Sequence, residues 1–180
     1  ALQIRFEVVD RLVDPVAEGF DLDVRIGDEI APQLIARRLM ANHRILCAAP
    51  DYLARHGAPR SLPELSGHQC LVIKERDHPF GVWRLRSRAG EETVKVSGAL
   101  STNHGEIALR WALDGAGIIL RSRWHAQPYL DAGRLVQVLP DFTQEANVWA
   151  VYPQRLGNSA KVRVCVEFLE RELAAAQAPG

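Results

Sequence analysis

Residues 10–27 of this 180-residue chain, DRLVDPVAEGFDLDVRIG, give the clearest indication of its fold. Its first part ends at Gly19, a residue suited to the end of a helix, and its last part is the strand-like run Leu22–Ile26. Proline is unfavourable inside a helix but suits its first position. We therefore expect Asp14 to cap a short helix that begins at Pro15. A helix followed at once by a strand is a building block of α/β domains.

The rest of the chain continues this alternation of strands and helices. Period-two alternation and short apolar runs predict strands at Ile4–Val8, Leu34–Leu39, Arg44–Ala49, Cys70–Ile73, Val82–Leu85, Thr93–Val96, Ile118–Leu120, Leu135–Leu139 and Val148–Tyr152. Helical spacing and helix-ending residues predict helices over residues 50–57, 61–65, 106–113, 124–130 and 160–176. Strands that alternate with helices indicate βαβ units and a largely parallel sheet, so the fold class is α/β.

The composition is that of a globular domain with no obvious nucleic-acid surface. The chain is 47% hydrophobic and 24% charged, with 22 basic and 22 acidic side chains. A domain that holds DNA through phosphate contacts needs a basic stripe. The tightest basic groupings, Arg84–Arg88 and Arg121–Arg123, alternate with other residues and indicate solvated faces. No apolar run approaches the roughly 20 residues that cross a bilayer, so we expect no membrane partner.

No set of residues predicts an enzyme, a metal site or a cofactor. His68 with Cys70 is the nearest approach to a metal-binding pair, and no second pair completes a tetrahedral set. Cys47 is the best candidate nucleophile, but its apolar neighbours favour an inert thiol. All three cysteines, including Cys165, lie in apolar runs. Buried free thiols predict a reducing, cytoplasmic location.

Two places suit a small ligand. Arg25, Ile26 and Gly27 end a strand that we expect to be parallel, and ligands bind at the carboxyl ends of such strands. The alternative is that Arg25 pairs with a nearby carboxylate such as Asp10. One arginine at a strand end would favour an anion.

The second place is Thr102-Asn103-His104, which precedes a helix expected to start near Glu106. Hydroxyl and amide groups at the positive end of a helix suit an anion. The alternative is that Asn103 or Thr102 only caps the helix.

The same residues resemble a known family, the LysR-type transcriptional regulators. Residues 10–27 are similar to the family stretch D-R-L-V-D-L-V-x-E-G-F-D-L-A-I-R-I-G, and residues 49–59, APDYLARHGAP, to S-P-x-Y-L-A-R-H-G-x-P. Pro15 and Asp23 depart from this pattern, because the family usually has leucine and a small residue there. Further segments in the family's order and spacing are 65–71, 103–106, 112–118 and 133–139. The resemblance covers essentially the whole chain.

The resemblance implies an effector-sensing domain. Its fold would be two Rossmann-like subdomains of the type 2 periplasmic-binding-protein kind, joined by crossovers near Lys74-Glu75 and Tyr152-Pro153. The first subdomain would comprise residues 1–74 plus 153–180, and the second residues 75–152. A small effector in the cleft would shift the protein between conformations. The expected effector contacts are Asp10, Arg25, Ile26, Gly27, Thr102, Asn103, His104 and Leu120.

The resemblance also implies partners. DNA would be bound only by a winged helix-turn-helix that precedes this region in the family, and the protein would form a homodimer or homotetramer. The family's effector domain also has an earlier strand, and we expect it between Ile4–Val8 and Leu22–Ile26, where it would satisfy backbone groups. The alternative function is a solute-binding protein for transport, since fold does not fix function. Export would require a signal sequence and would expose three cysteines to oxidation.

Overall fold

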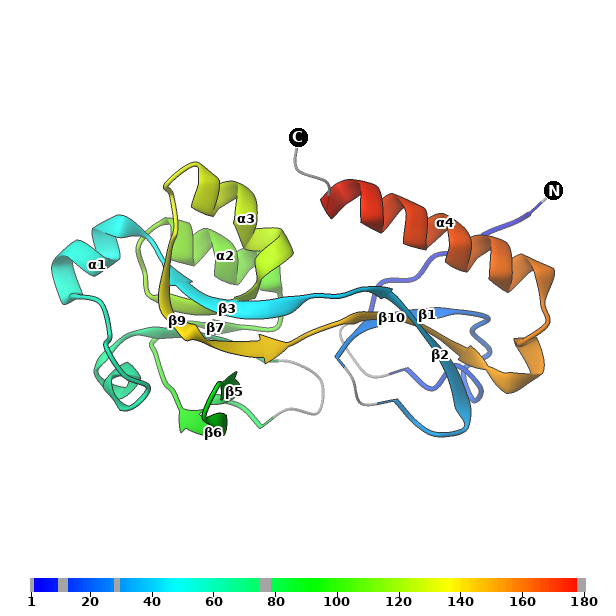
Figure 1. Ribbon diagram of the computed structural model, residues 1–180, viewed down its shortest axis with the longest axis horizontal. Coiled ribbons are helices and arrows are strands. Elements are labelled where there is room, and N and C mark those ends of the chain that lie inside the picture. The colour runs from blue at the N-terminus through cyan, green and yellow to red at the C-terminus, as the bar shows by residue number, and fades with distance from the viewer. Residues whose placement is uncertain (1, 10–12, 28–29, 75–78, 178–180) are drawn as a thin grey trace. The chain divides into compact units, whose positions relative to one another are not determined.

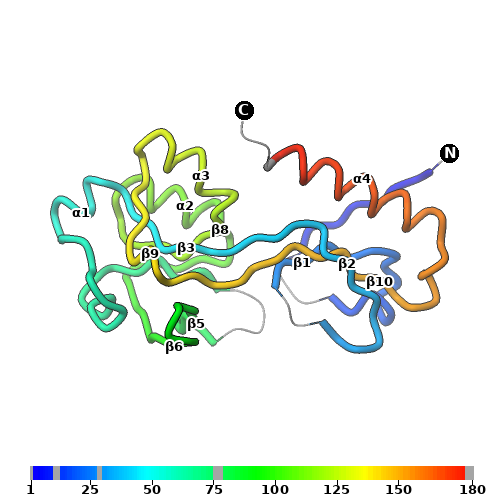
Figure 2. Tube along the Cα trace, in the orientation of Figure 1, coloured from blue at the N-terminus to red at the C-terminus, as the bar shows by residue number. Residues whose placement is uncertain are grey.

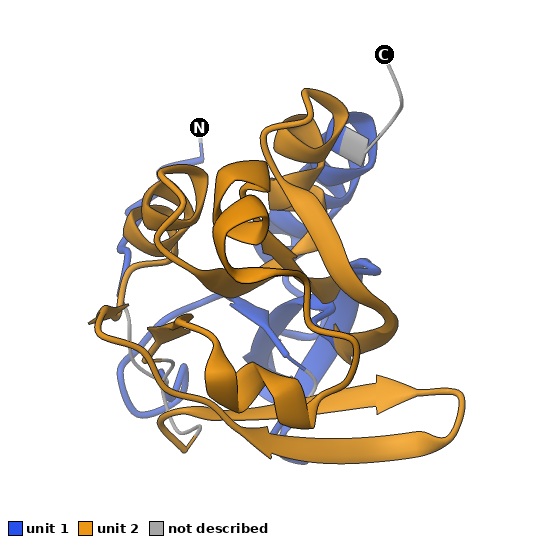
Figure 3. Cartoon of the chain, turned by 90° about the vertical axis from the view of Figure 1, so that its left-hand side faces the viewer, with its two compact units in different colours: residues 1–42, 145–180 blue, residues 43–144 orange. Residues whose placement is uncertain are grey.

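The chain folds into two compact units in a computed structural model that describes residues 2–9, 13–27, 30–74 and 79–177 (Figure 1). Unit 1 comprises residues 1–42 and 145–180, and unit 2 comprises residues 43–144 (Figure 3). The chain passes between them after Asn42 and again after Gln144 (Figure 2). The crossovers expected at residues 74–75 and 152–153 are therefore misplaced.

Unit 1 contains a three-stranded antiparallel sheet covered by one long helix. The strand order is β1 (Asp23–Ile26), β10 (Val148–Pro153) and β2 (Leu34–Met40). After the short helix η2 (Gln154–Leu156), α4 (Ala160–Gln177) returns along this sheet (Figure 1). Val162 and Val166 of α4 pack on buried residues of β2 and β10. The core of unit 1 therefore lies between α4 and the sheet.

Unit 2 contains a seven-stranded mixed sheet. Its order is β6-β5-β9-β3-β8-β4-β7. The strands are β3 (His43–Ala48), β4 (Cys70–Ile73), β5 (Val82–Ser87), β6 (Gly90–Lys95), β7 (Ser101–Thr102), β8 (Ile118–Ser122) and β9 (Val136–Glu145). Among the pairings described, only β4 with β7 and β4 with β8 are parallel. The expectation of a largely parallel sheet is wrong, because periodicity reports which face is buried and not the direction of the neighbouring strand.

Strands at the centre of unit 2 are buried on both faces. On β3, Ile45 and Cys47 pack with α2 (Gly105–Leu113) and α3 (Arg123–Asp131). Leu46 and Ala48 point to the opposite face, where α1 (Pro50–His56) and η1 (Pro63–Gly67) contribute core residues. β8 and β4 alternate in the same way. Residues 43–74 share this core, which explains why the crossover lies at Asn42 and not at Lys74.

The expected strand at Ile4–Val8 is absent from the structure. Residues 2–9 form no strand, and Ile4, Phe6 and Val8 are 73%, 82% and 83% exposed. The alternation of apolar side chains favours an extended, half-buried segment, but a strand also needs a neighbour to pair with. In the described part of unit 1, β1 pairs with β10.

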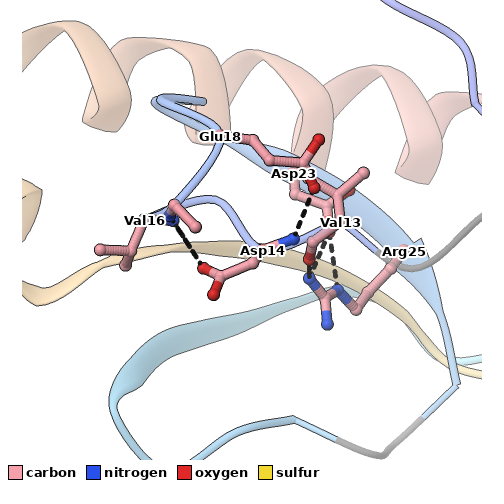
Figure 4. A network of polar contacts seen from close by, with 7 residues as sticks. Val13, Asp14, Val16, Glu18, Asp23 and Arg25 are labelled. Carbon is pink, nitrogen blue, oxygen red and sulfur yellow. Dashed lines mark hydrogen bonds and ion pairs between the residues drawn. The ribbon is translucent and has the colours of Figure 1, made fainter.

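The helix expected after Asp14 is a hydrogen-bonded turn over residues 15–19. The backbone N–H of Val16 donates to Asp14 Oδ1 at 2.9 Å (Figure 4). The N–H of Ala17 donates to the same oxygen at 3.2 Å. Glu18 N–H donates to the Asp14 carbonyl at 3.0 Å. The predicted capping role of Asp14 is thus present, but positive φ at Gly19 ends the segment after one turn.

Candidate functional site

Arg25, the first expected ligand-binding residue, is engaged inside unit 1. It lies on β1, is 5% exposed, and donates from Nε to Asp23 Oδ2 at 2.8 Å (Figure 4). Its NH2 group donates to the Val13 carbonyl at 3.1 Å. These bonds tie the capped turn to β1, and such charge-assisted bonds are strong. Arg25 thus pairs with a carboxylate, as the alternative interpretation expected, and that carboxylate is Asp23. Asp10, the carboxylate named in that interpretation, lies outside the described residues.

The strand that carries Arg25, β1, is antiparallel to its neighbour and not parallel as expected. β1 runs antiparallel to β10, so the rule for carboxyl ends of parallel strands does not apply here. Ile26 is half exposed, and the N–H of Gly27 donates to the Asn147 carbonyl. The geometry gives this end of β1 a structural role in unit 1.

The second expected place lies at the carboxyl ends of parallel strands in unit 2. Thr102 ends β7 and pairs with Ile73, the last residue of β4. β4 is also parallel to β8, which contains Leu120. The structure therefore brings Thr102 and Leu120 to the edge of the sheet at which α/β proteins bind ligands.

The segment before α2 is not a simple helix cap. The N-cap residue is His104, and within the described chain its side chain makes no capping hydrogen bond. Thr102 Oγ1 accepts a bond from His104 N–H at 3.0 Å. Neither Thr102 nor Asn103 is the N-cap residue, so the alternative of pure capping by these two does not hold. The first N–H groups of a helix lack partners within it, and here they follow directly after Thr102-Asn103-His104.

A small, partly open pocket lies beside this edge, within unit 2. Arg44 and Gln144 contribute its polar groups, and Leu120 with Trp83 lies among its apolar walls. Its remaining lining residues are Leu71, Val72, Ile73, Pro79, Gly81 and Val82. The Arg44 guanidinium donates to Gln144 Oε1 at 2.8 Å. Gln144 Nε2 in turn donates to the Arg84 carbonyl at 2.9 Å, which fixes the orientation of the amide.

Arg44 and Gln144 were not among the residues expected from the sequence. Arg44 opens the buried run Ile45–Ala49, and a cation at the start of an apolar strand is the signal that could have marked it. Gln144 lies 100 positions further along the chain, and only the pairing of β9 with β3 brings the two together.

Arg121 and His125 form a polar cluster at the start of α2. Arg121 Nε donates to His125 Nδ1 at 3.1 Å, and His125 Nε2 lies 3.1 Å from Glu106 Oε2. Burial and the Arg121 charge lower the pKa of His125, and Glu106 opposes this shift. The grouping Arg121–Arg123, expected to be a solvated face, is half-buried.

Residues considered for metal binding and catalysis have other environments. His68 Nδ1 shares a hydrogen bond with Tyr52 Oη at 3.1 Å. Burial raises the pKa of the Cys47 thiol to about 12. Among the residues that the structure describes, no group of three His, Cys, Asp or Glu side chains could hold a metal ion. Nor is any helix in the described segments both long enough and apolar enough to span a membrane.

Comparisons with known proteins give consistent matches over almost the whole chain. A family model described as "LysR substrate binding domain" matches residues 1–174. The HTH-type transcriptional regulator DmlR of Escherichia coli K12 is 61% identical over 96% of this chain and 56% of its own length. The HTH-type transcriptional activator TtdR of the same strain is 56% identical over 93% and 54%. This chain thus spans about half the length of these curated relatives.

Solved structures agree with these matches. The structure of CrgA, a LysR-type transcriptional regulator from Neisseria meningitidis, is similar with a TM-score of 0.72 and 31% identity. The similarity covers 88% of this chain and 54% of that chain. The two-unit α/β arrangement is therefore that of a regulatory domain of the periplasmic-binding-protein type.

Proposed function

Since the chain belongs to the LysR substrate-binding domain family, we propose that it is the effector-sensing part of a cytoplasmic transcription regulator. DmlR and TtdR carry the names of HTH-type transcription regulators, which favours regulation over the alternative of solute binding for transport. In this proposal DNA is bound by a helix-turn-helix domain outside the chain, and the regulator acts as a homodimer or homotetramer. The domain itself performs no chemistry and uses no cofactor.

The effector is proposed to be a small anion that binds in unit 2. The carrying observation is the pocket that Arg44 lines at the carboxyl ends of β4 and β8, beside Thr102. Arg44 lines this pocket and donates to the amide oxygen of Gln144. An anion in the pocket would accept from this guanidinium, while Leu120 and Trp83 would contact its apolar part. Thr102, Asn103 and His104 would add polar contacts from the edge of the site.

This assignment does not use Asp10, Arg25, Ile26 and Gly27 as effector contacts. The bonds of Arg25 to Asp23 and Val13 support a structural role for that end of β1. The proposal therefore moves the charged contact of the effector from Arg25 to Arg44.

Calorimetric titration of the chain with a panel of small organic acids and their neutral amides tests the proposal. We expect binding by one or more acids, no binding by the matching amides, and an affinity about tenfold or more lower in Arg44→Met. Loss of a charge-assisted hydrogen bond of about 1.5–3 kcal/mol accounts for that change. Arg84→Met is the matched control, because the Arg84 side chain is exposed and only its carbonyl meets Gln144. Equal binding of acids and amides, or equal losses in both variants, would contradict the proposal.

A further inference from the structure

Side chains from three elements of unit 2 form a continuous polar chain beside the start of α2. Arg121 of β8 donates to His125 Nδ1 from both Nε and NH2, at 3.1 and 2.5 Å. His125 of α3 faces Glu106 of α2 through its other ring nitrogen, Nε2, at 3.1 Å. The two ring nitrogens of His125 therefore face different kinds of partner: Nδ1 faces a hydrogen-bond donor, Arg121, and Nε2 faces an acceptor, Glu106.

This arrangement fixes the protonation state of His125. An arginine guanidinium has donors and no acceptor, so Nδ1 must accept and carry no proton. The proton then resides on Nε2 and is donated to Glu106. A neutral imidazole satisfies both bonds, whereas an imidazolium, with donors at both nitrogens, cannot accept from Arg121.

The charged groups around His125 favour this neutral form. Burial and Arg121 lower the pKa of His125 and Glu106 raises it, so the first two outweigh the third. β3 also packs against α3. Its Cys47 thiol responds to the Arg121 charge but stays protonated, because burial raises its pKa to about 12. Burial, and then the charge of Arg123 on α3, lower the pKa of His43 on β3.

The Arg121 guanidinium lies directly against the first residue of α2. A Cβ atom on Gly105 would stand 2.0 Å from NH1 of Arg121, so only glycine leaves room for the guanidinium there. Gly105 directly follows the segment Thr102-Asn103-His104, so Arg121 lies at the same edge of the sheet as these proposed contacts. It lies on the face that α2 and α3 cover, opposite to the face of Leu120. The position of Arg121 thus adds a positive charge beside Thr102-Asn103-His104, the part of the proposed effector site at the start of α2.

We propose that His125 is a positioning residue whose neutral ring orients Arg121 at the start of α2, so that acidification breaks their two hydrogen bonds, shifts Arg121 and weakens anion binding. The effect on binding rests on the proposed effector site, whereas the hydrogen-bond chain itself does not. A fall in anion affinity on acidification distinguishes this role, because a histidine that merely adds positive charge on protonation would strengthen anion binding.

Nitrogen-detected NMR of the labelled chain tests the hydrogen-bond chain without any ligand. We expect the Nε2–H tautomer for His125 at neutral pH and a pKa below 6.5, the usual value for histidine. Arg121→Met should raise that pKa, and Glu106→Gln should lower it further. An Nδ1–H tautomer, or a titration that neither substitution moves, would overturn the proposal.

Sulfate is a suitable probe for the effect on binding, because its charge stays constant while histidine titrates. Sulfate affinity should fall several-fold on acidification through the titration of His125. His125→Gln should remove this pH dependence while keeping affinity at neutral pH, because a glutamine amide can both accept from Arg121 and donate to Glu106. His43→Gln is the matched control and should leave the dependence intact. Gly105→Ala should weaken sulfate binding at all pH values, because the new Cβ displaces Arg121.

Two outcomes distinguish the positioning role of His125 from the effector site. Affinity that rises on acidification, or a pH dependence that persists in His125→Gln, would overturn the positioning role. If sulfate fails to perturb Thr102 and Gly105 at any pH while the tautomer and its titration are as expected, the proposed effector site fails and the hydrogen-bond chain stands.

Discussion

Unit 1 and unit 2 each contain an arginine near an expected ligand site, and they use it in opposite ways. Arg25 of unit 1 is 5% exposed and bound to the carboxylate of Asp23. Arg44 of unit 2 is half-buried, lines a pocket and donates to the amide of Gln144. Arg25 is enclosed by its hydrogen-bond partners, whereas Arg44 lies at the wall of a pocket. Access to a pocket, and not the position at a strand end, therefore separates the structural arginine from the one suited to a ligand.

The two units differ in strand direction at these positions as well. β1 is antiparallel to its neighbour β10, whereas β4 is parallel to both β7 and β8. Only unit 2 thus has the adjoining carboxyl ends of parallel strands that form ligand sites in α/β sheets.

The largest expected difference between the units is in thiol reactivity. Burial raises the pKa of Cys47 and Cys70 in unit 2 from 9.0 to about 12. At neutral pH these two cysteines therefore carry roughly a thousandfold less thiolate than a thiol with a pKa of 9.0. Cys165 on α4 of unit 1 is only partly buried. Labelling with a thiol-disulfide reagent at neutral pH should modify one cysteine in the native protein and all three after denaturation. Cys165→Ser should abolish the native reaction, and a fast reaction that survives in this variant would show that the core of unit 2 is open.

Arg25→Met should destabilise unit 1 by about 3–5 kcal/mol. The substitution removes the cation that pairs with the largely buried Asp23 carboxylate. Arg38→Met, on the exposed face of β2, should change stability by less than about 0.5 kcal/mol. Urea unfolding of both variants measures the difference. Equal midpoints would show that the Asp23–Arg25 pair is not structural, and would restore Arg25 as a candidate ligand-binding residue.

Thr102→Val should lower effector affinity about fivefold, as expected for one hydrogen bond of about 1 kcal/mol. The substitution keeps the shape of the side chain but removes the hydroxyl that accepts from His104 N–H. Ser101→Ala, at an exposed neighbouring position, is the control. Calorimetry with the tightest-binding acid of the panel measures the affinities of the two variants. Identical affinities would remove Thr102 from the site.

The smallest expected effect is on DNA, since the chain has no net positive charge to attract phosphates. The chain holds 22 basic and 22 acidic residues, and we expect no sequence-specific DNA binding by it alone at physiological salt. Fluorescence anisotropy with promoter DNA measures this. Tight, sequence-dependent binding would mean that recognition does not depend on a domain outside this chain.

Local patterns in the sequence predicted most elements but not how they pair. The helices at residues 50–56 and 105–113 match the helical spacing and the glycine or proline signals at their ends, and the helix at 160–177 matches its apolar spacing. Ile4–Val8 has an equally clear strand pattern and forms no strand, because pairing depends on a neighbour that periodicity cannot report. The direction of β1 and the position of the crossovers depend on distant partners in the same way.

The candidate site was predicted in part. Thr102 and Leu120 lie at the edge that the rule for parallel strands indicates, and the sequence named both. The bond between Arg44 and Gln144 joins residues 100 positions apart, so no local pattern contains it. For Arg25 the sequence left a ligand and a carboxylate open as partners, and only the three-dimensional contacts distinguish them.

The most direct test of the central claim is a map of amide chemical-shift changes on titration of the labelled chain with a bound organic acid. We expect the largest changes to cluster in unit 2, at Arg44, Leu71–Ile73, Thr102 and Leu120, around the pocket and the adjoining strand ends. Changes concentrated instead at Val13 and Asp23–Gly27 of unit 1 would contradict it, because they would place the anion on Arg25.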